Sequence, residues 1–155
     1  MRLLGIDYGA RRIGLALSDA TGLLARPWKT IARQGSPGRV ADALAGEIAR
    51  LRAEDDGLEG VVLGLPRRLN GSPTDQTAAV EKLAASLRSR IEVPVVLQDE
   101  RLSSREAESL LARRLKDWRK RKPLLDATAA AVVLQDYLDS RDRSAGAGPM
   151  EDDDR

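Results

Sequence analysis

The sequence contains no cysteine and no histidine. Without cysteine there is no disulfide framework, no thiolate nucleophile and no zinc–thiolate site. Without histidine there is no imidazole base and no serine–histidine–aspartate triad. Any acid–base or metal chemistry must therefore rest mainly on aspartate and glutamate, whose oxygen atoms suit hard cations such as Mg²⁺ or Mn²⁺.

Aromatic residues are scarce, with two Trp, two Tyr and no Phe among 155 residues. The length suits one domain, and a hydrophobic content of 42% is enough to bury a core. That core must be built from Leu, Val, Ile and Ala. This composition is typical of an α/β protein with a largely buried sheet.

Long apolar runs are also missing, so no segment is expected to span a membrane. Asp7 interrupts the N-terminal apolar run too early for a signal peptide, and we expect a cytoplasmic protein. The net charge is +2, which permits a nucleic-acid partner without demanding one. We predict one domain over residues 1–139 and a disordered acidic tail over residues 140–155.

The hydrophobic pattern predicts three strands joined by short connections, over residues 2–7, 12–18 and 25–32. Three such strands are typical of an antiparallel meander. Two strand–helix units follow, with strands over residues 60–65 and 94–97 and helices that begin near residues 37 and 74. Further helices are predicted after Ser103 and over residues 125–138. This order predicts an α/β domain with a mixed five-stranded sheet flanked by helices.

Acidic residues stand at the ends of two predicted buried strands. Asp7 closes the first, where ligands often bind in such sheets, although an aspartate that only starts a turn is common. Asp99 and Glu100 close another strand. Because adjacent strand residues point to opposite faces, only one of the two is expected to face a shared site. Capping of the next helix is the alternative for both.

Asp126 lies on the apolar stripe of the last predicted helix, together with Ala130 and Val133. An acid in a first helical turn is also favoured by the helix dipole, and both interpretations stay open. If the three sets of acids converge, their carboxylates repel one another unless a cation holds them. One or two Mg²⁺ ions there would polarise a phosphoryl group and activate water, without any need for histidine or cysteine.

Basic residues gather in two places that suit contact with a phosphate backbone. The first follows a strand end at Arg67 and Arg68, and the second is a run that includes Lys116, Arg119, Lys120, Arg121 and Lys122. A solvated helix end is the alternative for the run. Arg101, Arg11 and Arg12 lie near the predicted acidic site and either contact nucleic acid or pair with the acids. Tyr8 either stacks on a base or packs in the core.

Four ordered motifs resemble the YqgF/RuvX family. They are Gly5-Ile6-Asp7-Tyr8-Gly9 with Arg12-Ile13-Gly14 and Ser18-Asp19, then Gly64-Leu65-Pro66 with Asn70-Gly71 and Gln76, then Asp99-Glu100-Arg101-Leu102-Ser103, and Asp126-Ala127 with Gln135-Asp136-Tyr137. The resemblance covers most of residues 1–139. It implies an RNase H-like fold and an acidic metal site at Asp7, Glu100 and Asp126.

The same resemblance implies a metal-dependent nuclease linked to maturation of the 5′ end of precursor 16S ribosomal RNA. A Holliday junction resolvase-like DNA nuclease is the alternative among enzymes. Related resolvases carry an acid at the end of the fourth strand, whereas Gly64 to Arg68 contains none. A non-catalytic RNA-binding assembly factor is the alternative outside enzymes. We expect a monomer or homodimer whose partner is precursor rRNA or structured DNA.

Overall fold

The computed structural model describes residues 1–68, 70–100 and 126–141. Five strands form one sheet: β1 (Arg2–Tyr8), β2 (Arg12–Ser18), β3 (Ala25–Ala32), β4 (Leu58–Leu65) and β5 (Val95–Asp99). The described helices are α1 (Pro37–Ala53), α2 (Asp75–Arg88) and a C-terminal helix over residues 126–141. The chain therefore forms the mixed five-stranded α/β sheet that its sequence predicts.

The sheet has the strand order β3-β2-β1-β4-β5. The meander β1–β2–β3 is antiparallel, while β4 runs parallel to β1 and β5 runs parallel to β4. The ends of β1, β4 and β5 consequently lie along one edge. Residues that follow these strands are brought together there, although they are far apart in the sequence.

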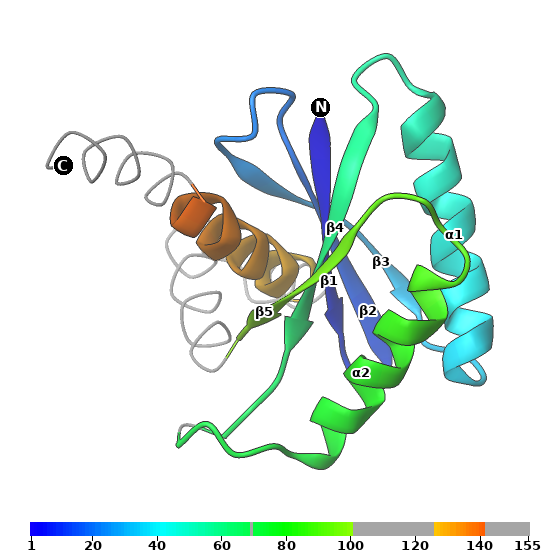
Figure 1. Ribbon diagram of the computed structural model, residues 1–155, viewed down its shortest axis with the longest axis vertical. Coiled ribbons are helices and arrows are strands. Elements are labelled where there is room, and N and C mark those ends of the chain that lie inside the picture. The colour runs from blue at the N-terminus through cyan, green and yellow to red at the C-terminus, as the bar shows by residue number, and fades with distance from the viewer. Residues whose placement is uncertain (69, 101–125, 142–155) are drawn as a thin grey trace, which may run out of the picture.

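The two faces of the sheet carry separate apolar clusters, as Figure 1 shows: α1 and α2 cover one face, and the C-terminal helix crosses the other. Along β1 the side chains alternate between these clusters, with Leu4, Ile6 and Tyr8 toward α1 and α2 and Leu3 toward the C-terminal helix. Asp7 lies four residues after Leu3, and side chains an even number of residues apart on a strand share a face. Its side chain therefore points to the face that the C-terminal helix covers.

Local capping sets the starts of α1 and α2. The Ser36 hydroxyl accepts a hydrogen bond from the backbone of Arg39, and Pro37 follows it at the first helical position. Thr74 and Thr77 form a reciprocal capping box at the start of α2. The predicted starts of these helices are confirmed. Strand β4 begins two residues earlier than predicted, at Leu58.

The C-terminal helix packs through small residues. Ala130, Ala131 and Leu134 belong to its buried cluster, whereas Tyr137 is only partly buried. The helix includes residues 140 and 141, which lie beyond the predicted domain boundary at residue 139. Residues 142–155 and the helix predicted after Ser103 lie outside the described residues. Within the described part of the chain, no helix is long and apolar enough to cross a membrane.

Candidate active site

Asp7 occupies the penultimate position of β1, at the carboxyl edge of the sheet. Its partner across the antiparallel ladder is Gly14 on β2. On the other side, β4 places Gly64 one residue beyond Leu63, which is paired with Ile6. The carboxyl group of Asp7 is therefore bordered by two residues without side chains, which leaves room above the sheet for groups from elsewhere.

Glu100 fills the room above Gly64. A Cβ atom on Gly64 would lie 2.3 Å from a carboxylate oxygen of Glu100, so the glutamate side chain crosses directly over this glycine. The backbone N–H of Glu100 donates to the carbonyl of Leu65 at 3.2 Å, which holds the residue against the end of β4. Glu100, the residue that follows β5, thus places its carboxylate above β4 near the centre of the sheet. The end of β4 itself carries no acidic residue.

The side chains of Asp7 and Glu100 hydrogen bond to each other. The pKa of Asp7 is raised to about 6, mainly by burial; the hydrogen bond with Glu100 opposes this rise, and the charge of Asp126 contributes to it. Burial, followed by the charge of Asp7, raises the pKa of Glu100 to about 8. At neutral pH the shared proton therefore resides on Glu100, which donates to the Asp7 carboxylate.

Asp126 enters the site from the start of the described C-terminal helix. The carbonyl oxygen of Asp126 would lie 1.9 Å from a Cβ atom on Gly14, so the helix backbone rests directly on this glycine. The Asp126 carboxylate forms an ion pair with Arg12 at 3.4 Å, and both side chains are partly exposed. Asp126 therefore lies within electrostatic reach of Asp7, but its carboxylate is directed to Arg12.

The donor set suits a hard divalent cation only in part. Asp7 and Glu100 already meet, and a cation between their oxygens would replace the proton they share. Within the described residues, however, no group of three or more acidic side chains is close enough to hold an ion. Asp126 would have to turn from Arg12 toward Asp7 to provide a third ligand.

Comparison with known proteins shows which family the chain belongs to. A family described as "RuvX: Holliday junction resolvase" matches residues 1–140. The chain belongs to the RuvX family. A provisionally named pre-16S rRNA nuclease of Geobacillus kaustophilus is 41% identical over 143 residues, which are 91% of this chain and 99% of the relative. The equivalent protein of Syntrophus aciditrophicus is 40% identical over 90% of this chain and 89% of its own length.

Solved structures agree on the fold of this RuvX family member. T. thermophilus RuvC in complex with a Holliday junction substrate superposes with a TM-score of 0.56, over 91% of this chain and 95% of the other. A second structure of Thermus thermophilus RuvC has the same TM-score, with 19% identity over 91% of this chain and 96% of the other. The predicted RNase H-like fold is confirmed, and at 20% identity or less the likeness is one of fold alone.

Several motif residues of this RuvX family member are structural rather than chemical. The Ser18 hydroxyl accepts the backbone N–H of Leu3 at 2.8 Å, and Asp19 caps the β2–β3 turn through the backbone N–H groups of Leu23 and Leu24. The hydrogen bond that Asp19 accepts from Thr21, followed by those from the backbone of Leu24 and Leu23, lowers its pKa to about 2. Sequence spacing alone does not separate such residues from those of the site.

The predicted basic residues are only partly described. Arg67 and Arg68 are exposed in the loop after β4, and a backbone hydrogen bond from Arg68 to Ser72 shapes that loop. The others lie outside the described residues: Arg101, Lys116, Arg119, Lys120, Arg121 and Lys122. Tyr8 is 3% exposed, and Arg33 covers its ring at 3.9 Å, so the interpretation of Tyr8 as a core residue is favoured over base stacking.

Sequence reasoning gave Gln76 no role in the site beyond its place in a motif. Its side-chain amide donates to the carbonyl of Tyr8 at 2.7 Å, directly after Asp7. Thr77 bonds to the carbonyl of Pro66 at the end of β4. The first turn of α2 therefore fixes the end of β1, which carries Asp7, and the end of β4, after which the loop with Arg67 begins. An amide in a first helical turn is the only signal the sequence offers.

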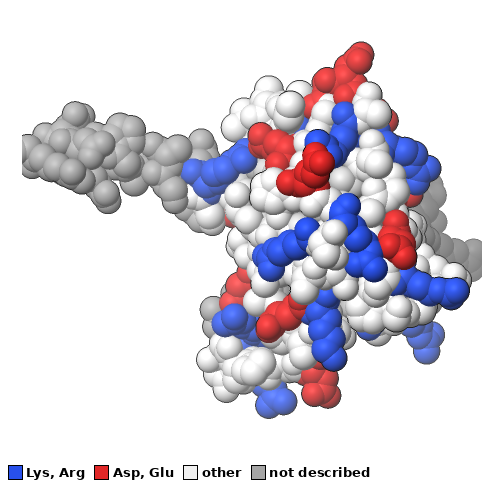
Figure 2. Space-filling view, turned by 45° about the vertical axis from the view of Figure 1, so that its right-hand side comes forward, with Lys and Arg blue, Asp and Glu red and all other residues white. Residues whose placement is uncertain are grey.

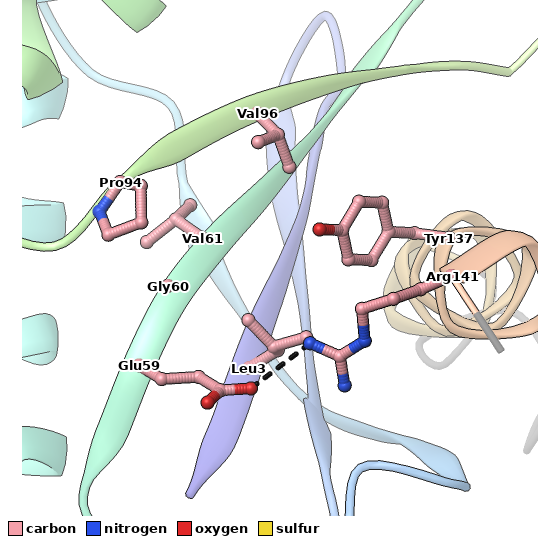
Figure 3. A pocket seen from close by; sticks show the side chains of 8 residues that line it. All are labelled: Leu3, Glu59, Gly60, Val61, Pro94, Val96, Tyr137 and Arg141. Atoms are coloured by element: carbon pink, nitrogen blue, oxygen red, sulfur yellow. Dashed lines mark hydrogen bonds and ion pairs between the residues drawn. The ribbon is translucent and has the colours of Figure 1, made fainter. Parts of the chain in front are cut away.

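A small pocket lies at the opposite end of the sheet. It has a volume of about 110 Å³ and is lined by residues from the starts of β1, β4 and β5 and from the end of the C-terminal helix. Figure 3 shows Tyr137 and Arg141 facing the strands across this space, with Arg141 paired to Glu59 at 3.1 Å. None of the predicted site residues lines it, so the candidate active site is the acidic edge and not this pocket.

Proposed function

We propose that this RuvX family member is a phosphodiester-cleaving nuclease that acts on precursor 16S rRNA. The observation that carries the proposal is the Asp7–Glu100 carboxyl pair at the carboxyl edge of an RNase H-like sheet, with Asp126 beside it. The names of relatives at about 40% identity over nine-tenths of the chain support RNA as the substrate. The protein offers no histidine or cysteine for another hydrolytic mechanism.

In this proposal Asp7 and Glu100 would hold Mg²⁺ or Mn²⁺, and Asp126 would be the third ligand if its side chain turned away from Arg12. Such a cation, when bound, polarises the phosphoryl group and lowers the pKa of water. Glu100 must lose its proton before it can serve as a ligand. Because burial and Asp7 together raise its pKa to about 8, proton release and cation binding are coupled at neutral pH.

The protein's own residues also set the geometry. Gly64 leaves the path by which Glu100 reaches Asp7, and Gly14 lets the backbone of Asp126 approach the sheet. Gln76 fixes the carbonyl of Tyr8 beside Asp7. These contacts hold the side chains of Asp7 and Glu100 together before substrate binds, so these two acids need little movement at the moment of reaction. The basic residues predicted to hold the strand include the exposed Arg67 and Arg68.

A DNA-junction nuclease is the second candidate, because the matching family is described as a Holliday junction resolvase. Backbone contacts dominate the affinity for nucleic acid and carry little information about its type. A direct comparison separates the two candidates. The purified full-length protein is incubated with a precursor 16S rRNA fragment and with a four-way DNA junction, each in Mg²⁺, Mn²⁺ or EDTA.

Cation-dependent cleavage of the RNA in preference to the junction is the expected result. Preferential cleavage of the junction would replace rRNA by branched DNA as the substrate. RNA binding without cleavage of either substrate, under every cation condition, would contradict the nuclease and favour a non-catalytic assembly factor.

A further inference from the structure

We propose that Arg12 is a phosphate-binding residue of the acidic site, and that its guanidinium exchanges Asp126 for a phosphate of the bound nucleic acid. The inference rests on the proposed function and adds a substrate contact that the sequence left open between phosphate binding and simple pairing with an acid. It concerns a described residue on the same edge and face as Asp7. Arg12 stands at the start of β2 and is weakly held by its acidic partner.

The register of the sheet places Arg12 on the face of the acidic pair. Gly14 is directly opposite Asp7, and Arg12 lies two residues before Gly14 on the same strand. Side chains two residues apart on a strand share a face, so Arg12 and Asp7 project to the same side. Arg12 is the first residue of β2 and thus stands at the outer margin of the carboxyl edge, where a strand of nucleic acid can approach.

The present partner of Arg12 holds it loosely. The Nε atom of Arg12 is 3.4 Å from the Asp126 carboxylate, whereas a charge-assisted hydrogen bond is typically about 2.7–2.9 Å long. The two side chains are 48% and 34% exposed. Exposed ion pairs of this kind contribute little to stability, because solvent screens the two charges. A phosphate that offers two oxygens to the guanidinium can therefore displace the carboxylate.

The backbone below Arg12 is well supported, so the guanidinium can move without disturbing the strand. Arg33 donates from its side chain to the carbonyl of Gly9 at 3.1 Å and from its backbone to the carbonyl of Arg11 at 2.9 Å. Its guanidinium also covers the buried ring of Tyr8. Arg33 is thus a positioning residue that anchors the β1–β2 turn from the end of β3.

Basic residues on the α1 and α2 face differ in their surroundings. Figure 2 shows Lys and Arg side chains interspersed with Asp and Glu over that face. Arg50 pairs with Glu47, Arg90 pairs with Asp42, and Arg52 pairs with Glu92 at 3.5 Å. Each of these cations is paired with an acid outside the predicted site. The Arg52–Glu92 pair nearly matches the Arg12–Asp126 pair in length and is therefore a suitable control.

The exchange also explains how one carboxylate can serve in two ways. In the free protein Arg12 neutralises Asp126, which limits the repulsion between Asp126 and Asp7. When a phosphate takes Arg12, the carboxylate of Asp126 is released next to the other two acids. Substrate binding and completion of the predicted ligand set are thereby linked through one arginine.

The test measures binding without cleavage. Fluorescence anisotropy of a labelled single-stranded RNA is recorded in EDTA at several salt concentrations, for the wild-type protein and for Arg12→Ala, Arg12→Lys and Arg52→Ala. Arg12→Ala is expected to bind about tenfold more weakly and to reduce the slope of log affinity against log salt by about 0.7, the value for one contact to a single strand. Arg12→Lys should keep the slope, and Arg52→Ala should match the wild type.

An Arg12→Ala protein that melts at the wild-type temperature and binds RNA with unchanged affinity and slope would overturn the proposal, as would an absence of RNA binding by the wild type. If Arg12→Ala melts early, Arg12→Gln, which removes the charge but keeps most of the side chain, should show the same reduced slope, and a wild-type slope in a stably folded Arg12→Gln protein would overturn the proposal. A wild type that binds through Arg12 but never cleaves would contradict the proposed nuclease and leave the phosphate contact confirmed. The two failures are therefore distinguishable.

Discussion

The carboxyl groups of Asp7 and Glu100 hydrogen bond to each other, although their strands, β1 and β5, are separated in the sheet by β4. The contact is possible because Gly64 on the intervening strand has no side chain. Two buried carboxyl groups in contact cannot both ionise without cost unless a cation joins them. The pair is therefore both the predicted centre of the chemistry and a source of instability in the cation-free protein.

Stability without divalent cations should fall as the pH rises. In the folded protein the pKa values of Asp7 and Glu100 are raised from 3.8 and 4.5 to about 6 and about 8. The folded state therefore keeps protons that the unfolded chain has lost, and the stabilisation is lost as the pH rises through these values. Urea unfolding in EDTA from about pH 5 to about pH 9 measures this for the wild type and for Glu100→Gln, which cannot titrate.

The difference between the two proteins is the informative quantity. Glu100→Gln should gain stability relative to the wild type as the pH rises from about 4.5 to about 8, the unfolded and folded pKa values of Glu100, and the gain should level off above this window. Titrating groups away from the Asp7–Glu100 pair affect both proteins equally, so the difference reports on the pair itself. A difference that stays constant with pH would show that the carboxyl pair does not hold the shared proton.

Divalent cations should reverse this loss. Above the pKa of Glu100 both carboxylates are charged, and Mg²⁺ or Mn²⁺ that binds only the folded state stabilises it by mass action. Thermal unfolding of the wild type with increasing Mn²⁺ should show a rise in melting temperature that depends on concentration. Asp7→Asn should show a much smaller rise. An equal rise in both proteins would place the cation elsewhere.

Gly14→Ala should destabilise the protein and displace Asp126. The added Cβ would lie 1.9 Å from the carbonyl oxygen of Asp126, and backbone cannot yield as a flexible side chain can. We expect a loss of about 1–3 kcal/mol in the free energy of urea unfolding. Gly46→Ala is the matched control, because nothing lies within 4 Å of its added Cβ in α1 and alanine favours a helix. Equal effects of the two substitutions would contradict the proposed helix contact.

Gly64→Ala should impair function more than folding. Its added Cβ would meet the far end of the Glu100 side chain at 2.3 Å, and that side chain can turn away. Once it does, Glu100 no longer meets Asp7. We expect cleavage to fall by at least about tenfold, with a stability change smaller than that of Gly14→Ala. Wild-type activity in Gly64→Ala would show that Glu100 is not needed beside Asp7.

The sequence predicts most of the fold because its periodicity and caps are local signals. Ser36 and Thr74 mark the helix starts where the structure has them, and the strand patterns carry the order of the elements. The alternation of side chains along β5, continued by one residue, also explains why Glu100 reaches the face on which Asp7 lies. The convergence of these two acids follows from the parallel pairing of β1, β4 and β5.

Contacts between residues far apart in the sequence are harder to predict from the sequence. The ion pair of Arg12 with Asp126 joins residues 114 positions apart, and several other acids were equally available to Arg12 in the sequence. Gly14 and Gly64 look like ordinary small residues in strands until the helix backbone and the Glu100 side chain are placed above them. The hydrogen bond from Gln76 to the end of β1 is equally hard to predict, because the sequence does not show which acceptor a helical amide will meet.

The most direct test of the account is cleavage of a precursor 16S rRNA fragment in Mg²⁺ or Mn²⁺ by the wild type and by Asp7→Asn, with melting temperatures of both recorded in EDTA. Asparagine keeps the size of the side chain but removes the charge that holds a cation. The account predicts cation-dependent cleavage by the wild type and none by Asp7→Asn, which should fold at least as stably. Retained cleavage by a folded Asp7→Asn protein would contradict the assignment of this edge as the active site.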